Sequence, residues 1–105
     1  MTKAIIDIGT NTFNLLIANN SSEEIKVLYS TKRAVAIGMG GITKEIITES
    51  AMERALTALH EFEGIINQYT PSEVRHIATA AVREATNASE FIRQVKEDLA
   101  RDIEV

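Results

Sequence analysis

Residues 4–16 read AIIDIGTNTFNLL, and this stretch decides the predicted fold. Ala4–Ile8 and Phe13–Ala18 are short apolar runs that predict two strands. Between them lies a polar segment that begins with Gly9, a residue typical of tight turns. The stretch therefore predicts an opening hairpin.

Asp7 is the only carboxylate in the first run. An ionised carboxylate among isoleucines is expected to need a partner, such as a metal ion or a row of N–H donors. Gly9 lets the backbone approach a ligand, and Thr10, Asn11 and Thr12 bring side-chain and main-chain donors to the turn. These four residues are candidate phosphate ligands, with Asp7 a candidate ligand of Mg²⁺. A plain hairpin turn, in which the carboxylate bonds the turn's own amides, explains the same residues.

Composition limits the function classes. The chain has 105 residues, 45% of them hydrophobic, which suits one core and no second domain. It contains no Cys, and no apolar run approaches the length of a membrane span. A net charge of −4 without a long basic cluster argues against nucleic-acid binding. We expect a cytoplasmic protein that binds neither nucleic acid nor membrane.

The remaining elements follow from periodicity. Glu24–Arg33 alternates apolar and polar residues and predicts a third strand with one solvated face. A helix is predicted from the N-cap Thr48 to the region of Pro71. A second helix is predicted from Asn87, with Glu90 completing a capping box. The loop between the third strand and the first helix contains three glycines that do not fit a nucleotide-binding pattern: Gly38, Gly40 and Gly41.

Val74–Thr79 predicts a fourth strand that runs parallel to the first, because a whole helix separates it from the opening strands. Ligands of open α/β sheets gather at the carboxyl ends of strands, so Thr79 is expected near the turn that follows Asp7. Arg83 is positioned to bind a phosphate there. A surface ion pair with Glu84 or Glu90 explains the arginine equally well.

Two stretches together resemble the amino-terminal part of the exopolyphosphatase and guanosine pentaphosphate phosphatase family. They are IDIGTNTF (residues 6–13) and ATAAVREATNASEF (residues 78–91), and IITESAMERAL (residues 46–56) is similar to that family's first helix entry. The resemblance implies an α/β, ribonuclease-H-like lobe of the actin, sugar-kinase and Hsp70 superfamily. Its mixed sheet has the order β-β-β-α-β-α-β, and here the last strand, which begins at Ile103, is cut short.

The resemblance also implies an activity: Mg²⁺-dependent release of terminal phosphate from polyphosphate, or of the 5′ phosphate from guanosine pentaphosphate. It assigns the metal to Asp7, the first phosphate turn to Gly9–Thr12, and further phosphate contacts to Thr79 and Arg83. The resemblance places the family's general-base glutamate, second phosphate loop and second lobe beyond Val105. We therefore expect residues 1–105 to be part of the first lobe and, alone, to be inactive.

Three alternatives remain open. The first is a non-catalytic module that binds guanosine tetraphosphate or another phosphorylated ligand. The second is a lobe of an actin-like kinase or ATPase, and the third is a structural domain with a vestigial phosphate turn. A homodimer is possible, since an unfinished sheet leaves an edge and an apolar face.

Overall fold

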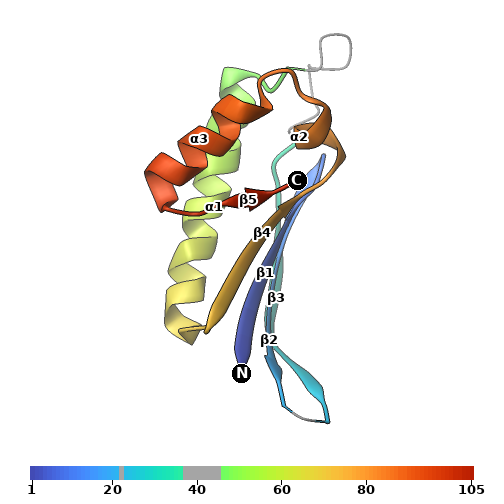
Figure 1. The fold of residues 1–105 in the computed structure, drawn as a ribbon, viewed down its shortest axis with the longest axis vertical. Coiled ribbons are helices and arrows are strands. Elements are labelled where there is room, and N and C mark those ends of the chain that lie inside the picture. Colours follow the sequence, from blue (N-terminus) through green and yellow to red (C-terminus); the bar gives the residue numbers. More distant parts are fainter. Residues whose placement is uncertain (22, 37–45) are drawn as a thin grey trace.

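The computed structural model describes residues 1–21, 23–36 and 46–105. Its sheet has five strands in the order β3-β2-β1-β4-β5, and the two longer helices lie against one face of it (Figure 1). The strands are β1 (Thr2–Ile8), β2 (Thr12–Asn20), β3 (Ile25–Ala34), β4 (Glu73–Ala78) and β5 (Ile103–Glu104). The helices are α1 (Glu49–Tyr69), α2 (Ala80–Glu84) and α3 (Ala88–Leu99).

The strand directions confirm the predicted topology. β1, β2 and β3 form an antiparallel meander, and β4 pairs parallel to β1 after the α1 crossover. β5 pairs parallel to β4 over a short register. The short helix α2 was not predicted, and it adds one element to the expected order. The glycines at 38, 40 and 41 lie outside the described residues.

Alternation along the strands builds the core. In β1 the side chains of Ala4, Ile6 and Ile8 are fully buried, while the residues between them face the other side of the sheet. The buried face packs under α1, whose buried residues are Ala51, Met52, Ala55, Ala58, Leu59, Phe62 and Ile66. Each large apolar side chain buried in this way contributes about 1.5–3 kcal/mol. The opposite face of the sheet carries no helix in the described part of the chain, and we call it the open face.

Of the two predicted helix caps, the structure confirms the cap at Thr48 and contradicts the cap at Asn87. Thr48 caps α1 as expected, because its Oγ1 accepts a hydrogen bond from Ala51 N at 3.2 Å. The predicted capping box of α3 is wrong, since Asn87 makes no side-chain cap bond. Instead, Asn87 Oδ1 accepts from Ile47 N at 2.9 Å and its Nδ2 donates to Ile47 O at 2.9 Å. The asparagine thus ties the start of α3 to the start of α1.

β3 departs from the predicted alternation. A register irregularity between Ile17 and Ala18 places Val27 opposite Ala18 and Tyr29 opposite Ile17. Tyr29 therefore turns toward the helices, where its ring lies 5.9 Å from that of Tyr69. Val27 faces the other side and is 57% exposed. The sequence pattern predicts one uninterrupted alternation along this strand, but the bulge reverses the alternation, so Val27 and Tyr29 lie on opposite faces.

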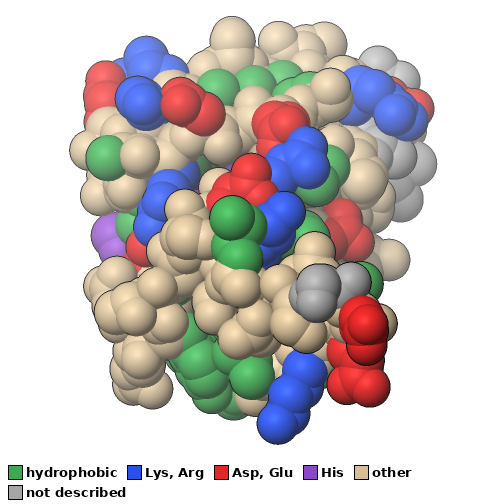
Figure 2. Space-filling view, turned by 60° about the horizontal axis from the view of Figure 1, so that its bottom comes forward, with side chains coloured by type: hydrophobic (Ala, Val, Ile, Leu, Met, Phe, Trp, Pro, Cys, Tyr) green, Lys and Arg blue, Asp and Glu red, His purple; other side chains and the backbone are tan. Residues whose placement is uncertain are grey.

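Charge on the surface is mixed in sign. On the face in Figure 2, Lys and Arg side chains lie next to Asp and Glu side chains, without a broad area of one sign. Exposed ion pairs join Arg75 to Glu104 and Lys3 to Glu73. Among the described residues, none of the helices combines the length and the hydrophobicity needed to cross a bilayer.

His76 is a buried polar residue in the core. It lies in β4 on the helix side, is 1% exposed, and its Nε2 has no hydrogen-bond partner among the described residues. Burial lowers the pKa of His76 from 6.5 to about 4; Glu63 opposes this shift, and Arg101 adds to it. Glu63 and Arg101 are themselves paired at 2.6 Å. The imidazole is therefore neutral in the folded chain at pH 7.

We expect this histidine to make the fold acid-sensitive. Between pH 6.5 and about pH 4 the unfolded chain binds a proton that the folded His76 does not, so the free energy of unfolding falls as the pH falls. The contribution is about 1.4 kcal/mol per pH unit. Urea unfolding of wild type and His76→Leu at pH 6.5 and 4.5 measures it. The variant should lose less stability on acidification than wild type, whereas His60→Gln, at an exposed position, should match wild type. Equal slopes for wild type and His76→Leu would contradict the prediction.

Candidate functional site

The turn after β1 is closed by a short backbone contact. Gly9 N donates to Thr12 O at 3.2 Å, and this bond joins the two ends of the turn. A Cβ added at Gly9 would lie 2.8 Å from the same oxygen, closer than real Cβ atoms approach. Thr10 and Asn11 form the exposed tip. The turn therefore requires glycine at its first position and presents polar groups to solvent.

Thr79 lies beside this turn, as predicted. Ile8 and Ala78 are partners in the parallel pairing of β1 with β4. Directly beyond them, Thr79 N and Thr79 Oγ1 both donate to Ile8 O, at 3.1 and 3.3 Å. The carboxyl ends of the two strands thus bring the Gly9–Thr12 turn and Thr79 together, although 70 residues separate Gly9 from Thr79 in the sequence.

The surroundings of Asp7 differ from the expectation. Ile6 and Ile8 point into the core, but Asp7 lies on the open face and is exposed. The argument that a buried carboxylate needs a compensating partner therefore does not apply, because water solvates this one. An exposed carboxylate at the end of β1 remains available to a cation or to a solvated ligand.

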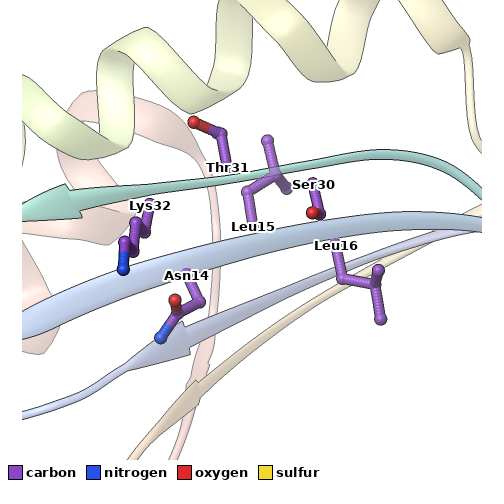
Figure 3. A pocket seen from close by; sticks show the side chains of 6 residues that line it. All are labelled: Asn14, Leu15, Leu16, Ser30, Thr31 and Lys32. Atoms are coloured by element: carbon purple, nitrogen blue, oxygen red, sulfur yellow. The ribbon is translucent and has the colours of Figure 1, made fainter.

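Two further polar residues lie in line with Asp7. In the strand register Asp7 is opposite Asn14, and Asn14 is opposite Lys32, so the three form a row across β1, β2 and β3 on the open face. Asn14 and Lys32 line an open hollow of about 390 Å³ together with Leu16 and Ser30. Figure 3 shows their side chains on one side of the sheet, while Leu15 and Thr31 point toward the helix.

Asn14 and Lys32 were missed as candidate site residues. The signal was available in the sequence, since each occupies a solvent-facing position of an alternating strand close to the turn. What was lacking was the register, which decides which polar residues become neighbours. Lys32 supplies a positive charge to the end of the sheet that holds Asp7.

Arg83 lies on α2, one turn after Thr79. Its backbone N donates to Thr79 O at 3.1 Å, and its side chain is exposed. Among the ion pairs of the described residues none involves Arg83, so the alternative of a surface pair with Glu84 or Glu90 finds no support there. A phosphate contact by Arg83 stays a prediction.

Asp7 meets the minimum requirement for Mg²⁺. The described residues contain no cluster of three or more His, Asp or Glu side chains arranged around a metal position. Mg²⁺ does not need such a cluster, because it is commonly held by one or two carboxylates together with substrate phosphates and several waters. A single exposed carboxylate beside a turn rich in donors fits that pattern.

Comparison with known proteins gives consistent matches. A sequence model of the Ppx/GppA phosphatase family matches residues 16–105. An exopolyphosphatase from Cytophaga hutchinsonii is 39% identical, with a TM-score of 0.94 over 98% of this chain and 33% of its own. The Ppx/GppA family member of Aquifex aeolicus is 28% identical, with a TM-score of 0.94 over 100% of this chain and 34% of its own. The chain spans about a third of the length of these structures, and the shared architecture confirms the predicted actin-like fold.

Proposed function

Because the chain belongs to the Ppx/GppA phosphatase family, we propose that it contributes one wall of the active site of a phosphoanhydride hydrolase. The substrate is polyphosphate, from which terminal phosphate is released, or guanosine pentaphosphate, which loses its 5′ phosphate. One observation carries the proposal: Asp7, the Gly9–Thr12 turn and Thr79 meet at the carboxyl ends of two neighbouring parallel strands. Ligand sites of open α/β sheets occupy this position.

The residues of this wall have different proposed roles in binding. The turn of Gly9, Thr10, Asn11 and Thr12 offers N–H and hydroxyl donors to phosphate oxygens, and the exposed Arg83 is available for a further contact. Asp7 would hold Mg²⁺, which would offset the negative charge of neighbouring phosphate groups. Lys32, in line with Asp7 across the sheet, provides a second positive charge on the same face.

The wall alone is expected to bind weakly and to catalyse little. Phosphoryl transfer depends on positioning the attacking water and stabilising charge from both sides of a cleft. The resemblance assigns the general base to a glutamate beyond Val105. Among the described residues, no ion pair or side-chain hydrogen bond connects Glu84 on α2 or Glu90 on α3 with the turn beside Asp7. We therefore propose that residues 1–105 in isolation release no phosphate.

A phosphate-release assay tests the proposal. The full product of the gene should release phosphate from one of the two substrates in the presence of Mg²⁺ and lose this activity when EDTA is added. Adenosine triphosphate serves as the comparison substrate. Faster turnover of this nucleotide would favour the kinase or ATPase alternative, and binding of guanosine tetraphosphate without any turnover would favour the non-catalytic module.

A further inference from the structure

Arg54 on α1 reaches across to the chain segment that follows β3. Its Nε donates to Val35 O at 2.8 Å and its Nη2 donates to Ala36 O at 3.2 Å. A third bond, from Nη1 to Ser50 Oγ at 3.3 Å, anchors the guanidinium to its own helix. One side chain thus holds two successive backbone carbonyls.

The same two residues hold the candidate phosphate turn from the other side. Val35 N and Ala36 N both donate to Asn11 O, each at 2.9 Å. Val35 and Ala36 therefore form a two-residue bridge, with the turn on one side and Arg54 on the other. This connection runs from Asn11 to α1 entirely through hydrogen bonds of 3.2 Å or less.

The bridge needs external support. Ala36 has a left-handed backbone conformation with φ of 52°, which is unfavourable for a residue other than glycine. Two donors of one planar guanidinium fix the neighbouring carbonyls in direction as well as in position. Lysine, with a single ammonium group, does not reproduce this paired geometry.

Fixing the Asn11 carbonyl has a consequence for the turn. The Asn11 C=O and the Thr12 N–H belong to one planar peptide unit, so the direction of the carbonyl determines the direction of that N–H. The two bonds from the bridge therefore limit rotation of the peptide at the tip of the turn. A misplacement of about 1 Å in a group that positions the substrate can lower the rate about 100-fold.

We infer that Arg54 is a positioning residue, which orients the Asn11–Thr12 peptide for phosphate through Val35 and Ala36. It lies outside the candidate site and does not touch the substrate. The effect of Arg54 on catalysis rests on the proposed function. The hydrogen-bonded connection from Arg54 to Asn11 does not depend on that function.

Kinetics of the full gene product test the role. Arg54→Gln should lower kcat/KM for the accepted substrate about tenfold, mainly through a higher KM, because binding donors are misplaced while the reacting groups remain. Arg54→Lys should fold as wild type does and should recover only part of the activity. Arg93→Gln removes another exposed arginine, which is paired with Glu97 on α3, and should leave kcat/KM unchanged. Wild-type kinetics for Arg54→Gln, or full rescue by lysine, would overturn the inference.

Amide hydrogen exchange of the 105-residue chain provides a readout that does not depend on activity. The Val35 and Ala36 amides should exchange at least about tenfold faster in Arg54→Gln than in wild type or Arg93→Gln, with circular dichroism unchanged. Unchanged protection of both amides would overturn the inference even if activity fell. If the wild-type protein hydrolyses neither substrate, the proposed function fails, and faster exchange would then support the connection without a catalytic role.

Discussion

Replacing Asp7 with asparagine is expected to lower the rate of phosphate release by the full gene product about 100-fold or more. Removing a group that only orients a metal ligand costs about 10–100-fold, and loss of the ligand itself should cost at least as much. The side chain keeps its size and loses its charge, so its affinity for a divalent cation falls. Asp7 is exposed, and among the described residues its carboxylate makes no hydrogen bond or ion pair. Stability should therefore change by less than about 0.5 kcal/mol.

Two further measurements separate this expectation from its rivals. Rates at increasing Mg²⁺ concentration should show partial recovery of the variant, because the metal is bound more weakly and not excluded. Asp98→Asn makes the same change at an exposed position on α3 and should leave the rate unaltered. If Asp7→Asn releases phosphate as fast as wild type, the turn is vestigial, and the chain is a structural domain.

The sequence allowed the fold to be predicted where local patterns decide the structure. Local spacing of apolar residues defines β1 and α1, and the Thr48 hydroxyl caps a helix that begins at the next residue. The parallel placement of β4 followed from the length of the crossover alone. With these elements in place, the closeness of Thr79 to the turn was predictable, and the bond from Thr79 to Ile8 O confirms it.

Errors arose where residues distant in sequence determine the outcome. Asn87 has the sequence signature of a helix cap, yet its side chain bonds Ile47, which lies 40 residues away. The Asn87 side chain makes two hydrogen bonds to the Ile47 backbone and none to the first turn of its own helix. No local pattern indicates such a partner, and the same is true of Arg54, which lies on a polar helix face but binds Val35.

The environment of Asp7 was predicted wrongly for a different reason. Its neighbours in the sequence are isoleucines, but neighbours along a strand point to opposite faces. Period-two alternation places Asp7 with Ile5, which is 36% exposed, on the open face. The candidate role of Asp7 depends on its exposure beside the Gly9–Thr12 turn. Its row with Asn14 and Lys32 is revealed only by the strand register.

The substitution Gly9→Ala is expected to destabilise the fold by about 1–3 kcal/mol, a typical cost of overpacking a close contact. The new Cβ would lie 2.8 Å from the Thr12 carbonyl oxygen, which is also the acceptor of the Gly9 N–H. Relief of the contact requires the turn to open. Because backbone and not a flexible side chain is in the way, the strain cannot be relieved by a change of rotamer.

Gly64→Ala is the matched control for this change. Gly64 is exposed in the middle of α1, and an added Cβ there meets nothing within 4 Å. Alanine is preferred over glycine in a helix interior, so this variant should gain about 0.5–1 kcal/mol. Urea unfolding of the two variants should give shifts of opposite sign for the same added methyl group. Phosphate release by the full gene product should fall only for Gly9→Ala, since only that turn presents donors to the substrate. A Gly9→Ala protein as stable and as active as wild type would show that the Gly9–Thr12 contact neither closes the turn nor shapes the phosphate site.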